Sequence, residues 1–434
     1  MKNRRAERLG ENAAAVLLLL FTVAAILWAN SPWGNGYFDF WSTPIGLSFG
    51  DLHWEITVRE FVNDGLMTFF FFVVGLEVKA QFTIGELTER SRAAVPVLAA
   101  IAGLILPALI FLLFNPSGDE ARAWGVVIST DTAFLVGALA IIAPKYPARL
   151  RTFLLTLAVV DDVGALLAIA LFYSEHIDPA PLAVAAGLLI ALVFVRYLPS
   201  PARGPAYSIL ALALWLALHA GGVHATLAGV AVALVVPVFT PERQRVEAAV
   251  DVIRAFRQSP NSEYARAATR SLRESISINE RLLTSFAPYV SFGILPFFAL
   301  ANAGVRLDAE TLRQAVSSPL TWGVIVGLVV GKLVGITGAT WLVQRLGMGR
   351  LAPGLTLRRV AGGAAVSGIG FTIALFIVDV AIDDERSADL ARVGVLAASV
   401  IAFMVGWATF RITDRLTPPV PVGLELVRPI DPDR

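Results

Sequence analysis

Long apolar runs separated by short polar connections follow one another along this chain of 434 residues. A transmembrane helix needs about 20 mainly apolar residues to cross a hydrocarbon core of about 30 Å. The pattern predicts an all-α integral membrane protein with one polytopic transmembrane domain at residues 1–416. We predict about twelve spans, at residues 13–29, 61–78, 95–114, 123–143, 150–172, 181–198, 206–220, 222–239, 286–305, 320–343, 360–381 and 394–410.

Residues 43–58 differ from the rest, because apolar and polar side chains alternate there on both sides of Gly50-Asp51. Such alternation around a Gly-containing turn is typical of a β-hairpin. A two-stranded hairpin alone is marginally stable in water, so we expect it to pair with a second copy and form a homodimer. An irregular loop is the alternative.

Two further segments are polar. Residues 240–281 form a charged, helix-compatible insertion with a break at Ser259-Pro260-Asn261-Ser262, which we interpret as solvated cytoplasmic surface. Residues 417–434 are rich in proline and polar side chains, which is typical of a mobile tail, here also expected on the cytoplasmic side.

The positions of lysine and arginine test this topology, because basic residues favour cytoplasmic connections. With both termini inside, 28 of the 35 basic residues lie on the cytoplasmic side and six lie outside. Without the eight basic residues of the long insertion, 20 still lie inside. The remaining residue, Lys332, lies within the tenth span.

Composition agrees with this class and excludes several others. The chain is 56% hydrophobic and 16% charged, and its mean hydropathy is +0.70. A net charge of +1 gives no reason to expect a nucleic-acid partner. The absence of cysteine excludes disulfides, thiol catalysis and cysteine metal sites, and four histidines argue against a protein-coordinated transition metal.

Four charged residues lie near the middle of predicted spans: Asp131, Asp161, Asp162 and Lys332. At that depth each costs about 2.5 to 3.5 kcal/mol, so together they cost on the order of 10 kcal/mol, comparable with the net stability of a domain. Lys332 is about 18 Å of helix from either surface, too far for its side chain to reach water. We interpret the four as an ion path, and structural ion pairing alone is the alternative.

The chemistry of these residues suits two ions. Na⁺ prefers hard oxygen ligands such as carboxylates, carbonyls and hydroxyls. Asp161 and Asp162 could therefore hold either Na⁺ or H⁺. Competition of two ions for one site is the physical basis of an exchanger.

Two spans contain interruptions. Ser129-Thr130-Asp131-Thr132 interrupts the fourth, and Gly362, Gly363, Gly368 and Gly370, with Ser367 and Thr372, weaken the eleventh. Spans 3–5 and 10–12 thus share a pattern in opposite orientations, and paired interrupted segments in inverted repeats indicate a transporter binding site. We predict that spans 4 and 11 are discontinuous and cross at mid-membrane. Glycine-mediated helix packing is the alternative for the eleventh span.

Several separated segments resemble the bacterial NhaA-type Na⁺/H⁺ antiporter family, in which inverted repeats are known. Together they extend over nearly the whole chain. They are Asn63-Asp64-Gly65-Leu66-Met67, Val74-Gly75-Leu76-Glu77-Val78-Lys79, Ser129-Thr130-Asp131-Thr132-Ala133, Val160-Asp161-Asp162-Val163-Gly164-Ala165, Gly222-Val223-His224-Ala225-Thr226-Leu227-Ala228-Gly229, Phe298-Ala299-Leu300-Ala301-Asn302-Ala303-Gly304, Gly331-Lys332 and Gly368-Ile369-Gly370-Phe371-Thr372.

The resemblance implies a secondary transporter of the bacterial cytoplasmic (inner) membrane that exports Na⁺ or Li⁺, imports more protons and serves pH and sodium homeostasis. Asp162 would be the principal cation ligand, with Asp161 beside it and paired with Lys332 in one state. Thr130 would assist, and Asp131 with Lys332 would balance the facing helix ends. The ion-binding core would move against the other helices. No cofactor is implied, and the surrounding lipid and a second copy are the expected partners.

Three residues match family positions near the ends of spans. Glu77 matches a charged funnel through which ions reach the site, although an ordinary interfacial carboxylate explains it equally well. His224 matches a histidine linked to pH response, and a hydrated interfacial histidine is the alternative. Asp64 is a further candidate for pH response or ion access, whereas the resemblance assigns no role to Asp379.

Intramembrane charges also occur in membrane enzymes and in solute symporters. An intramembrane aspartyl protease needs a Gly-x-Gly-Asp signature, but Phe371 follows Gly368-Ile369-Gly370. A prenyl-type enzyme needs a second acidic pair for Mg²⁺, which does not follow Asp161-Asp162. A sodium-coupled organic-solute symporter of related fold remains the alternative, although no aromatic or arginine set demands an organic-solute cavity.

Overall fold

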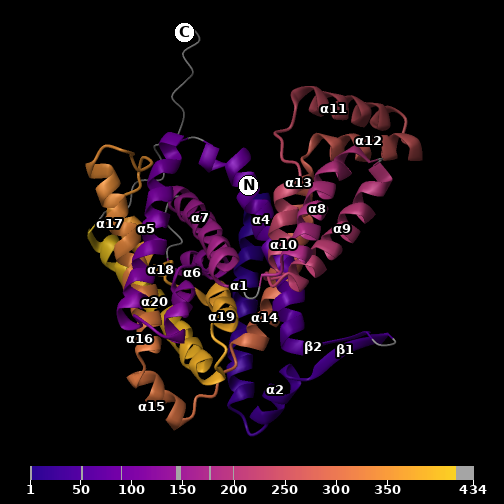
Figure 1. Ribbon diagram of the computed structural model, residues 1–434. Coiled ribbons are helices and arrows are strands. Elements are labelled where there is room, and N and C mark those ends of the chain that lie inside the picture. Colours follow the sequence, from indigo (N-terminus) through magenta and orange to yellow (C-terminus); the bar gives the residue numbers. More distant parts are fainter. Residues whose placement is uncertain are drawn as a thin grey trace.

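The computed structural model describes residues 2–49, 52–88, 90–142, 148–174, 177–198 and 200–416. These residues are mostly helical, and two strands project from one end of the molecule (Figure 1). The predicted tail at residues 417–434 and the hairpin turn at Gly50-Asp51 lie outside the described residues.

Seven stretches of the described chain are helical without a sharp bend and are long and apolar enough to cross a membrane. Three of them contain a π-helical turn, labelled η. They are α1 (Lys2–Ala29), α3 with η1 and α4 (Val58–Glu60, Phe61–Leu66, Met67–Thr83), α5 (Arg90–Phe114), α7 (Ala148–Phe172), α13 with η5 and α14 (Ile278–Tyr289, Val290–Ile294, Leu295–Asn302), α16 with η6 and α17 (Pro319–Val326, Gly327–Gly331, Lys332–Arg345), and α20 (Glu385–Leu416).

Two further pairs of helices are each bent at a short break. The 3₁₀ helix η3 (Asp119–Val127) meets α6 (Thr132–Ile142) at 48°, and α18 (Leu357–Val366) meets α19 (Phe371–Ala381) at 47°. Serine, threonine and aspartate at the first break compete with helical backbone bonds, and glycines weaken the helix at the second. With these pairs, nine of the twelve predicted spans correspond to membrane-capable stretches among the described residues.

The other three predicted spans correspond to helices that are not among these nine stretches. They are α8 (Pro179–Phe194) followed by the 3₁₀ turn η4 (Val195–Tyr197), α9 (Ser200–Ala220) and α10 (Leu227–Val235). Helix α10 has only nine residues, so the prediction of a continuous helix at 222–239 is wrong. Gly222 has a φ of 73° before the helix, and Pro237 forces extended backbone on Val236 after it. That all three cross a membrane stays a prediction.

Helices pack into two bundles that stand side by side in Figure 1. In the major bundle, α5 packs against α7 and α17, and α20 packs against α16, α18 and α19. In the minor bundle, α4 packs against α10 and α13, and α9 packs against α8 and α10. We assign η3 and α6 to the major bundle and η1 and α14 to the minor bundle, because they continue or contact these helices.

The remaining elements lie at the two ends of the bundles. Helices α11 (Arg243–Gln258) and α12 (Ser262–Ser275) form the predicted insertion and are separated at its predicted break. Exposed ion pairs such as Arg243–Glu247 and Arg270–Glu274 agree with a solvated surface. The other short helices are α2 (Gly34–Trp41), η2 (Glu86–Thr88) and α15 (Ala309–Ser317).

Strands β1 (Pro44–Phe49) and β2 (Leu52–Thr57) pair antiparallel, with Pro44 opposite Thr57 and Phe49 opposite Leu52. The predicted hairpin is therefore confirmed. In Figure 1 it projects from the end opposite to α11 and α12, which we call the hairpin end. Pairing with a second copy stays a prediction.

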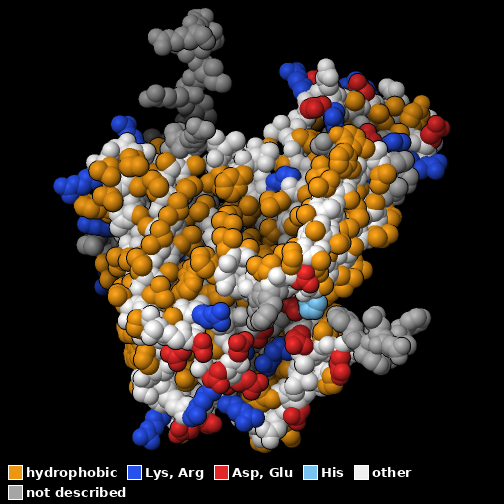
Figure 2. Space-filling view, in the orientation of Figure 1, with side chains coloured by type: hydrophobic (Ala, Val, Ile, Leu, Met, Phe, Trp, Pro, Cys, Tyr) orange, Lys and Arg blue, Asp and Glu red, His pale blue; other side chains and the backbone are white. Residues whose placement is uncertain are grey.

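The outer surface carries the apolar side chains that a lipid bilayer requires. Leu113, Leu171 and Ile209 are 80%, 71% and 68% exposed, which would be unfavourable on this scale in water. Figure 2 shows hydrophobic side chains over the middle of the molecule and charged ones gathered toward its two ends. The chain is a multi-pass membrane protein.

Candidate functional site

The two helix breaks touch each other inside the major bundle. The backbone N–H of Asp131, in the first break, donates to the carbonyl of Ile369, in the second, at 2.7 Å. Thr130 Oγ1 lies 2.9 Å from the carbonyl oxygen of Ser367. Buried backbone groups that the breaks remove from helical bonding are thus partly satisfied by the other break.

Asp131 joins the helices that leave the two breaks. Its Oδ1 accepts from the N–H of Phe134 in α6 at 3.0 Å, and its Oδ2 accepts from the N–H of Thr372 in α19 at 2.9 Å. The Thr372 hydroxyl donates to the same Oδ2. One carboxylate therefore caps two helix N-termini, where negative charge is stabilised by the helix dipole.

Lys332 follows directly after the π-helical turn η6, and its side chain is fully buried. Its Nζ donates to Asp161 Oδ2 at 2.5 Å and to the carbonyl of Ile128 at 2.6 Å. Ile128 ends the helix η3, so the ammonium also meets the negative end of a helix. Gly331 allows η6 to lie close to α5, since a Cβ at this position would lie 2.7 Å from Cα of Pro107 in α5.

Asp161 and Asp162 lie near the middle of α7 and are both buried. Asp161 Oδ2 is bonded to Lys332 and lies 2.7 Å from Thr130 Oγ1. Among the described side chains, Oδ1 of both aspartates and Oγ of Ser129 have no hydrogen-bond partner. Unpartnered buried oxygens cost free energy unless another group binds them, so these atoms are available to a cation.

Comparison with known proteins shows which family this is. Residues 8–410 match the family described as Na⁺/H⁺ antiporter 1. The chain belongs to the Na⁺/H⁺ antiporter 1 family. It is 70% identical over 433 residues to the "Na(+)/H(+) antiporter NhaA 1" proteins of Mycolicibacterium vanbaalenii and Mycolicibacterium gilvum, covering 100% of this chain and 70% of each relative. It is 44% identical to "Na(+)/H(+) antiporter NhaA 3" of Frankia alni over 408 residues, covering 94% of this chain and 88% of that protein.

The structure of this family member brings five of the predicted residues together: Thr130, Asp131, Asp161, Asp162 and Lys332. Glu77 lies on α4 and is exposed.

Asp64 and His224 lie apart from that cluster. Asp64 lies in η1, and its carbonyl accepts from Trp215 Nε1 at 3.2 Å. His224 is half-buried, with Nε2 2.8 Å from the carbonyl oxygen of Tyr173. A carbonyl only accepts, so this nitrogen carries a proton. Both residues lie between helices rather than at the helix crossing.

Sequence reasoning missed several partners at the crossing. It did not find the carbonyl of Ile128 as a partner of Lys332, because a backbone acceptor leaves no residue-type signal. It named Ser367 and Thr372 only as helix-weakening residues, whereas they contact Thr130 and Asp131. The π-helical turn before Lys332 has no recognised sequence signature either, although such turns are frequent at functional sites.

Proposed function

We propose that this protein is a secondary transporter, not an enzyme, that exchanges Na⁺ for H⁺ across the membrane. One observation carries the proposal: neighbouring buried aspartates, Asp161 and Asp162, each have a carboxylate oxygen without a partner among the described residues. The names of the relatives, Na⁺/H⁺ antiporter NhaA, support the same exchange.

One site serves both ions in turn. We assign Asp162 as the principal Na⁺ ligand, with Asp161 and Thr130 beside it. Next to Thr130 in the chain, Ser129 offers a further oxygen, Oγ, that has no partner among the described residues. A proton on Asp162 removes the charge that attracts Na⁺, and Na⁺ on Asp162 excludes the proton. The site therefore cannot complete a cycle with both ions bound.

Lys332 links Na⁺ binding to a second proton. Its only carboxylate contact among the described residues is Asp161, at 2.5 Å. A Na⁺ ion that takes Asp161 as a ligand competes with Lys332 for that carboxylate, and we assign the second released proton to the pair of Asp161 and Lys332. Two protons for each Na⁺ carry net charge, so exchange is electrogenic. Li⁺, which takes the same hard oxygen ligands, is a second cargo.

Asp131 keeps the crossing intact while the ions change. Its carboxylate joins α6 to α19, so both helices can move as one unit with the aspartates on α7. We propose that the major bundle moves against the minor bundle and exposes the site to each side in turn. Spans 4 and 11 would then be discontinuous helices of two inverted repeats, 3–5 and 10–12, within a twelve-span topology.

The remaining assignments concern the cellular location of the protein, its pairing with a second copy and its response to pH. We propose that both termini lie in the cytoplasm of a bacterial cell, that the protein resides in its inner membrane, and that the hairpin at 43–58 joins two copies. The excess of basic residues in predicted inner connections supports this orientation. Glu77 would line the cytoplasmic route to the site, and Asp64 and His224 would modulate the response to pH.

Everted membrane vesicles with an acidified interior test the exchange. Adding Na⁺ or Li⁺ should dissipate part of the pH difference, and Asp162→Asn should abolish this response while leaving the protein folded in the membrane. Asp308→Asn is the matched control, because Asp308 is an exposed helix cap whose role an asparagine can fill. No response in wild type from mildly acidic to mildly alkaline pH would contradict antiport, and Na⁺ uptake that depends on an organic solute would favour symport.

A further inference from the structure

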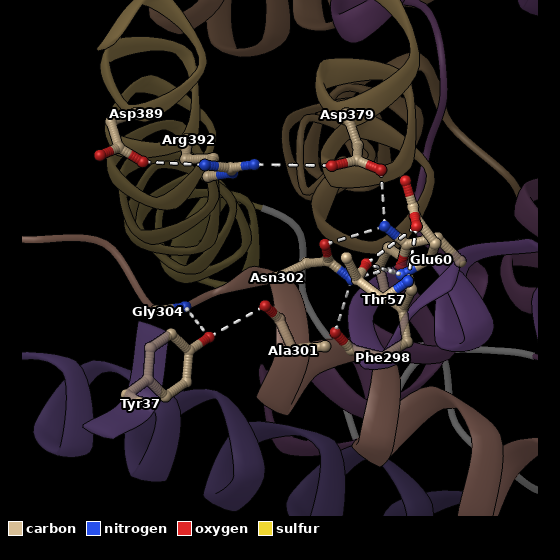
Figure 3. A network of polar contacts seen from close by, with 11 residues as sticks. Tyr37, Thr57, Glu60, Phe298, Ala301, Asn302, Gly304, Asp379, Asp389 and Arg392 are labelled. Carbon is tan, nitrogen blue, oxygen red and sulfur yellow. Dashed lines mark hydrogen bonds and ion pairs between the residues drawn. The ribbon is translucent and has the colours of Figure 1, made fainter. Parts of the chain in front are cut away.

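A polar network joins the two bundles at the hairpin end (Figure 3). Asn63 Nδ2, in η1 of the minor bundle, donates to Asp379 Oδ2, in α19 of the major bundle, at 2.6 Å. The two residues are 316 positions apart in the sequence. Its acceptor is a carboxylate, and hydrogen bonds to carboxylates are stronger than bonds between neutral groups.

Asn63 is held in place from its own bundle. Asn302, at the end of α14, donates from Nδ2 to Asn63 Oδ1 at 2.7 Å and to the carbonyl of Phe298 at 3.1 Å. Asn63 Nδ2 also donates to Asn302 Oδ1 at 3.2 Å. All four amide hydrogens are therefore used, and the orientation of both amides is fixed.

Asp379 is likewise held from its own bundle. Arg392, on α20, approaches Asp379 Oδ1 with Nη2 at 3.7 Å and donates from Nη1 to Asp389 Oδ1 at 2.8 Å. The Arg392 side chain is only 8% exposed. In Figure 3, Asp389, Arg392 and Asp379 form one line, and Asn302 lies below it.

This arrangement leaves each partner a contact within its own bundle after separation. If the bundles part at this point, Asp379 keeps Arg392 and Asn63 keeps Asn302. The large penalty of an unpartnered buried charge is thus avoided, and the loss is close to that of one hydrogen bond. A contact that breaks and re-forms at moderate cost suits a moving boundary better than a permanent structural tie.

Helix α19 connects this contact to the ion site. Thr372 contacts Asp131 near the start of α19, and Asp379 lies seven residues further along the same helix, about 10 Å away. Movement of one end of so short a helix moves the other. Deeper in the same boundary, Phe71 of α4 contacts Phe376 of α19 with ring centroids 5.1 Å apart.

At the opposite end of the molecule, Lys79 donates to the carbonyl of Leu234 within the minor bundle, and Arg149 donates to that of Pro353 within the major bundle. Figure 2 shows a notch between the bundles at the end that carries α11 and α12.

We propose that Asn63 and Asp379 form a latch that holds the bundles together at the hairpin end, and that the latch must open before the ion site can face that side. This rests on the proposed alternating exposure of the site. Asn63 and Asp379 are therefore positioning residues of the transport cycle, whereas Asn302 and Arg392 keep each half ready to close again.

Thiol labelling tests the latch without requiring transport. The chain contains no cysteine, so Phe71→Cys places a single reporter in the boundary, eight residues and about 12 Å deeper than Asn63. A membrane-impermeant methanethiosulfonate reagent is added from the hairpin side of oriented proteoliposomes. In this background, Asp379→Ala should raise the labelling rate roughly ten- to hundredfold, the effect of losing one bond to a charged group.

Two further variants separate a latch from general loosening. The double variant Asn63→Asp, Asp379→Asn swaps the donor and the acceptor, so the bond can form again in the opposite direction. It should return labelling to the slow rate. Thr321→Val removes another buried bond, from Thr321 Oγ1 to the carbonyl of Leu390 at 3.1 Å, which lies within the major bundle. It should leave labelling slow.

Equal labelling of the reporter with and without Asp379→Ala would overturn the latch. Equal acceleration of labelling by Thr321→Val would also overturn it, as would fast labelling of a folded Asn63→Asp, Asp379→Asn double variant. Vesicle transport distinguishes this from failure of the proposed function. Labelling that responds as expected in a protein that does not exchange Na⁺ for H⁺ keeps the latch and rejects antiport. Exchange of Na⁺ for H⁺ by a protein whose labelling rate is unchanged by Asp379→Ala keeps antiport and rejects the latch.

Discussion

Replacement of Lys332 by methionine tests whether the buried ion pair stabilises the helix crossing. Methionine has a similar length and no charge, so Lys332→Met leaves the Asp161 carboxylate in a site that water does not reach. The carboxylate loses a partner at 2.5 Å, and the carbonyl of Ile128 loses a donor at 2.6 Å.

The separation of the two charges gives the expected magnitude. At 2.5 Å and an effective dielectric constant of about 20, the attraction is about 7 kcal/mol. Much of it is offset by the desolvation of both groups, and removal of one partner of a buried pair typically costs about 3 to 5 kcal/mol. We expect a loss of unfolding free energy in that range for Lys332→Met.

Removing both charges should restore most of the loss. In Lys332→Met with Asp161→Asn both members of the ion pair are replaced by neutral side chains, so the double variant should be considerably more stable than the single one. Tryptophan fluorescence of the nine tryptophans, followed during thermal unfolding in detergent, measures the stability of wild type, both single variants and the double variant. A Lys332→Met protein as stable as wild type, or a double variant whose losses simply add, would refute the role of the pair.

Three further predictions follow from other parts of the structure. Asp131→Ala removes the cap of two helices, at Phe134 and Thr372, and should lower the unfolding free energy by about 1 to 4 kcal/mol and abolish exchange; normal stability in the unfolding assay would contradict the double cap. Burial raises the pKa of Tyr37 from 10.0 to about 12, so the folded state holds this proton more tightly, and stability should fall as pH rises through that interval; Tyr37→Phe should lack this loss, and an unchanged alkaline slope would count against it. Deletion of residues 43–58 should give monomers in mild detergent, and an unchanged dimer on size-exclusion chromatography with light scattering would reject pairing through the hairpin.

Much of the fold follows from the sequence because lipid imposes a simple rule. Apolar runs of sufficient length predicted the seven helical stretches and two bent pairs found among the described residues, and alternation of apolar and polar residues predicted the hairpin. The rule fails at α10, where Pro237 ends the helix although the composition stays apolar. Hydropathy measures solvent preference and is insensitive to the backbone angles that proline and glycine impose.

The site could be predicted from the sequence where charged residues lie in the middle of apolar spans. Asp161, Asp162 and Lys332 stand out because mid-membrane charge is costly, and the structure brings Lys332 to Asp161. Partners that are backbone carbonyls, such as Ile128, carry no such signal. The bond between Asn63 and Asp379 is equally hidden, since neither residue's sequence neighbourhood points to the other.

Proton release on cation binding tests the central claim most directly, that Na⁺ and H⁺ compete for the aspartates on α7. Purified protein in weakly buffered detergent solution is titrated with Na⁺ while a pH-sensitive dye reports released protons. We predict saturable proton release by wild type, none by Asp162→Asn, and normal release by Asp308→Asn. Saturable Na⁺ binding without proton release, or equal release by Asp162→Asn and wild type, would contradict the account.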